Sequence, residues 1–355
     1  MSKNTTLILP CAGKSTRFPG SRPKYLQTMP NGDLMVISAI NNLKLTNVAK
    51  IVITVVKEHI ETSNVDLAII ANRIFQLKAI TPEFLILDNF TSSQSETVAE
   101  TIKRKSITGG FFIKDCDNLF NFDIGCGNYV CTSKLDTNTN AVNKAYIKSD
   151  KFGNVSGIIE KKVINDIFCC GGYSFDSADE FVSTYDKVVS VKSIDAGEIY
   201  ISHIIQQMIL DTKIFGSKSV SGYIDLGTAK DWNSYVSQFK TVFIDIDGVI
   251  VENGSEFFSP KWGECKALTK NVETINELYA TGCVRIILTT ARKKTYEKET
   301  IRDLDNAKVN YDEVIFELPH AQRVLVNDFG GSNKYPSAVA INIKRDTEEL
   351  SYLLK

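Results

Sequence analysis

The stretch from Leu7 to Lys24 constrains the fold of this 355-residue chain more than any other. Three apolar residues at 7–9 predict a short buried strand, and a loop of small residues with spaced cations follows them. Small side chains let backbone N–H groups approach phosphate oxygens, and cations neutralise the charge on those oxygens. The loop has neither the Walker A nor the dinucleotide-binding glycine pattern. It therefore predicts a polyphosphate site of another kind, with a basic surface loop as the alternative.

The order of residues in this loop, from Ala12 to Lys24, is A-G-x-S-T-R-(x)5-P-K. It resembles the sugar nucleotidyltransferase signature A-G-x-G-T-R…P-K, with Ser15 in place of the second glycine. The resemblance implies catalytic roles for Arg17 and Lys24, with Lys24 balancing charge on the α-phosphate. It implies that the triphosphate of an NTP contacts Ala12, Gly13, Lys14, Ser15, Thr16 and Arg17.

Length and composition favour an ordinary protein of about two domains. The formal net charge of −1 gives no electrostatic case for nucleic acid or membrane as partners. The apolar runs are only strand-length, and the first six residues, MSKNTT, lack the apolar core of a signal peptide. We therefore expect a cytoplasmic protein whose eight cysteines are reduced. The oligomeric state is left open, including a homo-oligomer.

The alternation of apolar and amphipathic segments predicts an α/β fold for the first domain. Branched residues at 50–56 and 84–88 favour buried strands, and the segments 34–43 and 65–75 favour helices. Such alternation predicts a largely parallel sheet with helices on both faces. Ligands in these sheets bind beyond the carboxyl ends of the strands, where the loop from Gly13 to Arg17 is expected to lie.

Polar residues open the next helical segment, Thr91–Ile102. Ser93 and Glu96 have the spacing of a helix-capping box, which is the favoured interpretation of the residues alone. The resemblance to nucleotidyltransferases implies instead that Gln94, Ser95 and Glu96 contact the nucleobase.

Two aspartates predict a metal site at the end of the following apolar stretch, 110–120. On an extended chain, Asp115 and Asp117 point the same way. Mg²⁺ binds in this manner, through few protein carboxylates and the phosphate oxygens of a substrate. The resemblance places the metal-binding aspartate best at Asp117, with Asp115 as the alternative. It adds Asp225, in a D-x-G-T segment, as the second carboxylate, and it covers about residues 5–235.

Two further segments resemble the acceptor pocket of the same family. Glu160-Lys161, by itself more typical of a solvated turn, resembles the E-K pair, and Cys169–Phe175 resembles the G-x-Y-x-F strand. The resemblance implies that Glu160 accepts hydrogen bonds from sugar hydroxyls and that Lys161 holds the acceptor's phosphate. Gly172 and Glu198 complete the implied pocket, and a phosphorylated sugar or polyol is the implied acceptor.

A second domain is predicted at 239–355, after a first domain at 1–238. Its first apolar strand ends in D-x-D-G at Asp245 and Asp247. With this spacing, one carboxylate can attack phosphorus while the other protonates the leaving group. Predicted strands at 284–290, ending in Thr290, and at 323–329, ending in Asn327-Asp328, follow in order. The three strand ends resemble the motifs of haloacid-dehalogenase-like (HAD) phosphatases.

This second resemblance implies catalytic roles for Asp245, Asp247 and Thr290, with Mg²⁺ held by Asp245, Asp247 and Asp328. The gaps between the motifs are too short for a large cap domain. The family's usual lysine before the last motif is absent, and the cations that remain as substitutes are Arg292, Lys294 and Arg323.

The domain resembles small phosphatase domains of bacterial capsule and lipopolysaccharide gene clusters. Together the two resemblances predict a bifunctional Mg²⁺-dependent enzyme of surface-polysaccharide precursor synthesis. The alternatives are a non-catalytic binding or assembly role for the second domain, and a nucleotide sensor without catalysis.

Overall fold

The computed structural model describes residues 5–14, 18, 22–135, 141–191, 197–328 and 337–354. The chain divides into two compact α/β units, Met1–Asn233 and Ser234–Lys355. The division falls inside helix α7 (Ala229–Val236). Buried hydrophobic residues form separate cores in the two units. Each unit is therefore described by itself.

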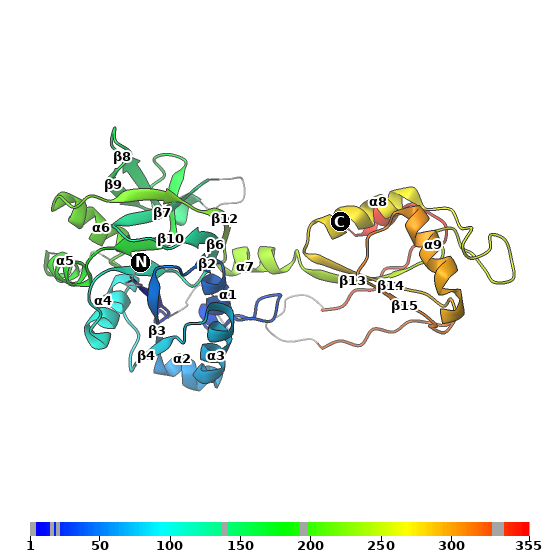
Figure 1. Ribbon diagram of the computed structural model, residues 1–355, viewed down its shortest axis with the longest axis horizontal. Helices are drawn as coiled ribbons and strands as arrows, with labels where there is room; N and C mark the ends of the chain where they lie inside the picture. Colours follow the sequence, from blue (N-terminus) through cyan, green and yellow to red (C-terminus); the bar gives the residue numbers. More distant parts are fainter. Residues whose placement is uncertain are drawn as a thin grey trace. The chain divides into compact units, whose positions relative to one another are not determined.

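A nine-stranded mixed sheet forms the centre of the first unit (Figure 1). Its main path runs in the order β11 (Gly216–Ser219), β7 (Tyr129–Lys134), β10 (Ile167–Phe175), β5 (Phe111–Lys114), β1 (Thr5–Pro10), β3 (Val48–Val56) and β4 (Glu83–Leu87). The strands β5, β1, β3 and β4 are parallel, whereas β10 is antiparallel to both of its neighbours on this path. The hairpin of β8 (Ala145–Ser149) and β9 (Val155–Glu160) joins the sheet through β10. A smaller sheet contains β12 (Ser221–Asp225), β6 (Asn118–Asp123) and β2 (Leu43–Lys44).

Helices cover both faces of the large sheet because successive residues of its central strand are buried on opposite sides. Leu7 and Leu9 pack in one core with residues of α1 (Met35–Asn41) and α3 (Leu67–Lys78). Ile8 packs in the other core with residues of α4 (Gln94–Lys105), α5 (Ala178–Val191) and α6 (Ile201–Leu210). Figure 1 shows these two groups of helices on opposite sides of the sheet, with α2 (Lys57–Ser63) beside α3. A continuous apolar strand is typical of this two-sided burial.

The single strand predicted at 110–120 is wrong, because the chain leaves the large sheet after Lys114. This lysine is fully buried, and its ammonium donates hydrogen bonds to the carbonyl of Asp115 (2.6 Å) and to the carbonyl and side-chain oxygens of Asn118 (2.8 and 2.6 Å). A buried ammonium needs such acceptors, and they close a tight turn around it. The chain then enters the smaller sheet at β6. Asp115 and Asp117 therefore lie in this turn and not on one extended strand.

The second unit is built on three parallel strands, β13 (Lys240–Asp245), β14 (Val284–Thr289) and β15 (Glu313–Ile315). Its core combines Ile244, Ile286 and Leu288 of the sheet with residues of α8 (Thr269–Ala280), α9 (Glu297–Ala307) and α10 (Leu350–Leu353). Short 3₁₀ turns in the two units occupy Lys24–Leu26, Ala141–Asn143 and Lys294–Tyr296.

The strand predicted at 323–329 is wrong for its described residues, 323–328. They have no strand conformation, and Val324, Leu325 and Val326 are 73%, 58% and 91% exposed. A strand requires a neighbour that satisfies its backbone groups. None of the strands in the described part of the second unit pairs with this segment. Residue 329 lies outside the described residues.

Among the helices that the structure describes, none has both the length and the apolar character needed to cross a bilayer.

Candidate functional site

A cleft of about 660 Å³ opens in the first unit beyond the carboxyl ends of β1 and β5. Its walls come from segments far apart in the chain: the loop after β1, the start of α4, the turn between β5 and β6, the β8–β9 hairpin, the residues before α6, and the end of β12. Parallel α/β sheets place ligands at this edge. Of the residues predicted from the sequence, the cleft is lined by Gly13, Lys14, Lys24, Gln94, Asp117, Glu160, Lys161, Glu198 and Asp225.

Other predicted residues lie behind the walls of this cleft. Ala12 is fully buried and packs with Val56 and Leu87. Gly172 faces the core, since a Cβ at this position would lie 2.9 Å from Cys131 and Phe120. Its neighbour Gly171 lines the cleft instead. The predicted residues Ser15, Thr16 and Arg17 lie outside the described residues.

The start of α4 divides the three residues expected at the nucleobase. Gln94 lines the cleft, but Ser95 is fully buried and donates to the carbonyl of Ile199 (2.6 Å). Ser93 accepts from the Glu96 amide (3.1 Å), and the Glu96 carboxylate accepts from the amide (2.6 Å) and hydroxyl of Ser92. These bonds stabilise the first turn of the helix. Helix capping thus accounts for the side chain of Glu96, although its carboxylate bonds to Ser92 and not to Ser93, the partner in the predicted capping box.

Lys24 lies against Asp117 at the floor of the cleft, with 2.5 Å between its ammonium and a carboxylate oxygen. The neighbours Tyr25 and Leu26 are each only 2% exposed, so they anchor the 3₁₀ turn that carries this lysine. Both charged side chains are mostly buried, at 13% and 18% exposure. Charges that are partly removed from water interact more strongly than surface pairs do.

Asp225 ends β12, and Asp117 lies in the turn just before β6, the strand that pairs with β12 in the smaller sheet. Asp225 pairs with Asn118 in the β12–β6 ladder, and the Leu226 amide donates to the Asp117 carbonyl (2.9 Å). A Cβ at Gly227 would lie 3.1 Å from a carboxylate oxygen of Asp225 and 3.4 Å from one of Asp117. Only a glycine gives both carboxylates full room beside this turn.

The two converging carboxylates suit a magnesium ion bound together with a nucleotide. No group of three or more His, Cys, Asp or Glu residues in the described ranges is placed to hold a metal ion. Mg²⁺ commonly takes one or two protein carboxylates and completes its shell with phosphate oxygens and water. Asp117 and Asp225 therefore fit this ion, and they are the residues that would hold it.

Asp115, the alternative metal ligand, has a different environment. Its carboxylate accepts a hydrogen bond from the Gln94 side chain, and its amide donates to the Gly171 carbonyl (2.9 Å). Burial and the neighbouring Asp117 charge raise the pKa of Asp115 to about 6. Asp117, which approaches Asp225, is thus the better placed of the two aspartates.

The side of the cleft predicted to bind the acceptor combines a carboxylate, hydroxyls and two lysines. Glu160 accepts from the Ser202 hydroxyl (2.6 Å), and burial raises the pKa of Glu160. Lys161 donates to the Tyr200 hydroxyl (2.5 Å). Lys144 forms an ion pair with Asp225. These groups suit a ligand that carries both hydroxyls and a phosphate.

Lys144 and Tyr223 are cleft residues that sequence reasoning missed. No motif marks Lys144, which follows a 3₁₀ turn and precedes β8. The hydrogen bond from the Lys161 amide to the Lys144 carbonyl (2.9 Å) brings the two lysines together. The motifs of the sequence predict no hairpin at 145–160; this hairpin, with Ala145 paired to Glu160, is the feature that would have indicated Lys144.

In the second unit, the predicted catalytic residues meet at the carboxyl ends of β13 and β14. The ladder pairs Asp245 with Thr289, which places Thr290 beside the loop that carries Asp247. The Thr290 hydroxyl lies 3.4 Å from an Asp247 carboxylate oxygen. Arg292 is fully buried and donates to Asp247 (2.7 Å) and to the equally buried Asp303 (2.8 Å).

The three cations considered as substitutes for the missing lysine have different ion-pair partners. Arg323 contacts the Asp245 carboxylate at 3.0 Å, and Arg292 is held by Asp247. Lys294, in the 3₁₀ turn, pairs with Glu297 at the start of α9. Only Arg323 lies at the predicted nucleophile.

The described residues do not assemble the predicted magnesium set of the second unit. The Asp328 amide donates to Asn327 (3.2 Å), and the Asp328 carbonyl accepts from Ser337. The described ranges hold no metal-binding group that includes Asp245, Asp247 and Asp328. The sequence prediction placed Asp328 at the end of a strand that this segment does not form.

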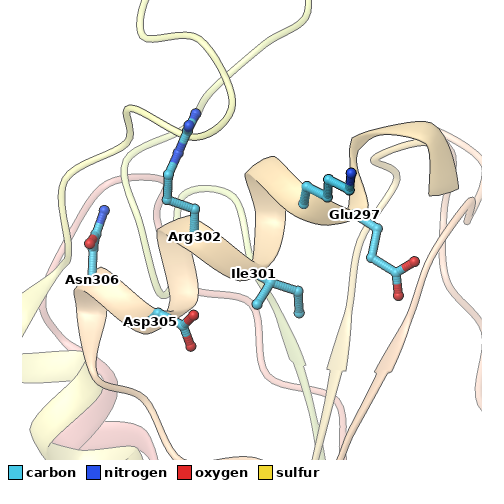
Figure 2. A pocket seen from close by; sticks show the side chains of 6 residues that line it. Glu297, Ile301, Arg302, Asp305 and Asn306 are labelled. Atoms are coloured by element: carbon cyan, nitrogen blue, oxygen red, sulfur yellow. The ribbon is translucent and has the colours of Figure 1, made fainter.

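The second unit has a shallow depression along a single helix, α9 (Figure 2). The residues that line it are Glu297, Lys298, Ile301, Arg302, Asp305 and Asn306. Arg302 extends away from this surface and donates to the Gly263 carbonyl (3.0 Å). Since all of its lining residues in the described structure belong to α9, this depression is not a candidate site.

No family model and no curated protein matches the chain. Solved structures do. A nucleoside-diphosphate-sugar pyrophosphorylase from Vibrio cholerae RC9 is 17% identical, with a TM-score of 0.54 over 65% of this chain and 99% of that chain. A putative glucose-1-phosphate thymidylyltransferase from Bacillus anthracis is 18% identical, with a TM-score of 0.52 over 66% and 94%. A UDP-glucose pyrophosphorylase is 12% identical, with a TM-score of 0.50 over 67% and 98%.

The N-terminal part of the chain, about 65% of it, has the nucleotidyltransferase-like Rossmann fold. The α/β fold predicted for the first domain is thereby confirmed. Identities of this size establish the fold alone. The second unit lies outside the matched part, so its HAD-like fold remains a prediction.

Proposed function

We propose that the first unit transfers a nucleoside monophosphate from an NTP to a phosphorylated sugar or polyol and releases pyrophosphate. The observation that carries the proposal is the convergence of Asp117 and Asp225 in one cleft, each paired with a lysine. Nucleotidyl transfer requires this combination of carboxylates for a metal and cations for phosphate oxygens.

In the proposed reaction, the loop at Gly13 and Lys14 holds the triphosphate, and Lys24 neutralises charge on the α-phosphate. An oxygen of the acceptor's phosphate attacks the α-phosphorus in line. The bond from that phosphorus to the bridging oxygen of the β-phosphate breaks, and pyrophosphate leaves. Mg²⁺ on Asp117 and Asp225 supplies further neutralisation of phosphate charge when bound. Catalysis of this kind consists mainly of positioning and charge stabilisation.

On the acceptor side, Glu160 and Ser202 present oxygen atoms to sugar or polyol hydroxyls, and Lys161 binds the acceptor's phosphate. Two of the similar structures are a putative glucose-1-phosphate thymidylyltransferase and a UDP-glucose pyrophosphorylase in complex with UDP-glucose, which supports an acceptor of this class. A product of this kind is an activated precursor for surface-polysaccharide synthesis, the role that we assign to the chain.

The test is pyrophosphate release with Mg²⁺ and each of the five common NTPs against a panel of sugar and polyol phosphates. One NTP and one acceptor are expected to give pyrophosphate, and Asp225→Asn is expected to remove the signal. Turnover at the wild-type rate in Asp225→Asn would reject the site.

For the second unit we propose phosphomonoester hydrolysis, because Asp245, Asp247 and Thr290 meet at one edge of its sheet. The Asp245 carboxylate attacks phosphorus, and Asp247 protonates the ester oxygen as its bond to phosphorus breaks, so that the alcohol leaves. Water then attacks the aspartyl-phosphate and releases inorganic phosphate. Phosphate release from a panel member, lost in Asp245→Asn, is the expected result.

A non-catalytic binding or assembly role is the competing proposal for this unit. It is favoured by the contact of Arg323 with Asp245 and by the place of Asp328 outside any metal-binding group of the described residues. Absence of phosphate release from wild type across the panel would select it.

A further inference from the structure

Lys144 lies where the acceptor side of the cleft meets the proposed metal carboxylates. Its ammonium pairs with Asp225 and donates to the Tyr223 hydroxyl (2.7 Å). It also lies 5.2 Å from the ring centre of Tyr223 and 5.6 Å from that of Phe168. The side chain is only 12% exposed. The attraction of a cation to an aromatic face is less directional than a hydrogen bond. The Lys144 ammonium therefore has more than one favourable position near these rings.

The pairing of Lys144 with Asp225 parallels that of Lys24 with Asp117. Each carboxylate proposed to hold the metal is thus neutralised by one lysine. A divalent cation and an ammonium repel each other strongly at contact distance in a partly buried site. A metal that takes the Asp225 oxygens therefore releases Lys144 from this carboxylate.

The released ammonium has a second place to bind. Lys144 and Lys161 are adjacent across the open end of the β8–β9 hairpin, where the Lys161 amide donates to the Lys144 carbonyl (2.9 Å), and both lysines line the cleft. Their ammonium groups contact different partners, the Tyr200 hydroxyl for Lys161 and the Tyr223 hydroxyl with Asp225 for Lys144. Two lysines on adjacent backbone positions of a cleft wall suit a ligand with two negative charges, such as a phosphate monoester, once Lys144 leaves Asp225.

We propose that Lys144 is an exchangeable counter-ion, which neutralises Asp225 before the metal binds and afterwards binds the acceptor's phosphate together with Lys161. This inference rests on the proposed function in one respect, namely that the bound phosphate belongs to the acceptor substrate. The exchange itself makes metal binding and phosphate binding cooperative, since the first event frees the ligand that the second one uses.

The first arm of the test measures Mn²⁺ affinity of the full chain by electron paramagnetic resonance, without nucleotide or acceptor. Lys144→Met keeps the apolar stem but removes the competing charge, so it is expected to bind Mn²⁺ about fivefold more tightly than wild type. Lys148→Met is the matched control, because Lys148 lies exposed at the far end of β8. It is expected to leave the affinity unchanged.

The second arm titrates inorganic phosphate with and without Mg²⁺, followed by ³¹P NMR. In wild type, Mg²⁺ is expected to tighten phosphate binding. In Lys144→Met, the ratio of phosphate affinities with and without Mg²⁺ is expected to be at least about threefold smaller than in wild type. Lys144→Arg is expected to restore part of it. Equal Mn²⁺ affinity of wild type and Lys144→Met, or an unchanged effect of Mg²⁺ on phosphate binding, would overturn the inference.

Neither arm requires turnover. If both arms give the expected result while no NTP yields pyrophosphate, the proposed function fails and the counter-ion exchange stands. If pyrophosphate is released but Lys144→Met binds Mn²⁺ as wild type does, the counter-ion exchange fails and the proposed function stands.

Discussion

At the scale of single residues, charge pairing explains why Lys24 and Asp117 tolerate their mostly buried positions. Each offsets the desolvation of the other, and Tyr25 and Leu26 hold the lysine in place. The strand, the loop and Lys24 were predictable because small residues and cations at this spacing have few other uses. Lys144 was not predictable, because its contact with Asp225 spans 81 residues of sequence.

Lys24→Ala is expected to lower the rate of pyrophosphate release by at least about a hundredfold, because it removes the cation proposed to stabilise the α-phosphate in the transition state. Lys148→Ala, at an exposed position, is the control. Steady-state kinetics on the two variants measure the effect. A rate within a few-fold of wild type for Lys24→Ala would remove this lysine from the proposed mechanism.

His59 is expected to make stability depend on pH. It is 6% exposed, its Nδ1 has no hydrogen-bond partner in the described structure, and its ring lies 5.1 Å from that of Phe90. Burial lowers the pKa of His59, so below about pH 6.5 the unfolded chain binds more protons than the folded one. The contribution of neutral His59 to the free energy of unfolding is fully present above about pH 6.5 and is lost as the pH falls through the lowered pKa of the folded state.

The matching variant is His59→Phe, which keeps a ring against Phe90 but does not titrate. Between pH 7.5 and 5.0, the melting temperature of the first unit, which contains His59, is expected to fall more in wild type than in the variant. Parallel curves for the two proteins would show that His59 contributes nothing to the pH dependence.

At the scale of elements, the turn between β5 and β6 determines the site. The sequence indicated one strand with two aspartates, whereas the buried Lys114 closes a turn and separates Asp115 from the pair of Asp117 and Asp225. Periodicity cannot predict this, since a lysine in an apolar run is not expected to be buried.

Gly171 is required opposite this turn. Its φ of +84° disfavours any side chain, and a Cβ would lie 2.5 Å from both Asp115 and Asn118. Gly153, in the β8–β9 turn, has nearly the same φ (+85°) but open space around it. Gly153→Ala is therefore expected to lower the free energy of unfolding by about 1 kcal/mol from backbone strain, and Gly171→Ala by about 3 kcal/mol. Denaturant unfolding that gives equal losses would contradict the close contact.

At the scale of the whole molecule, each of the two units has a hydrophobic core of its own. The fold of the first unit was predictable because its strands alternate with helices over more than two hundred residues and its motifs follow in order. The second unit was harder to predict. Its segment 323–328 contains the apolar run Val324-Leu325-Val326, yet it pairs with no described strand.

Separate cores predict separate unfolding. Ile286 is fully buried in the second core, and truncation of such a side chain costs about 2–5 kcal/mol. In differential scanning calorimetry, Ile286→Ala is expected to lower the transition of the second unit and to leave that of the first unchanged. Phe112→Ala, in the first core, is expected to do the reverse. A single transition that shifts with both variants would show that the units unfold together.

The central claim is that the cleft of the first unit performs nucleotidyl transfer, and the most direct measurement follows the label of an α-³²P NTP. Wild-type protein with Mg²⁺ and a sugar or polyol phosphate is expected to move the label into a sugar or polyol nucleotide, with unlabelled pyrophosphate released in equal amount. Asp225→Asn and Lys24→Ala are expected to leave the label in the NTP. Label that remains in NTP or appears as nucleoside diphosphate in wild type, for every acceptor tried, would contradict the account.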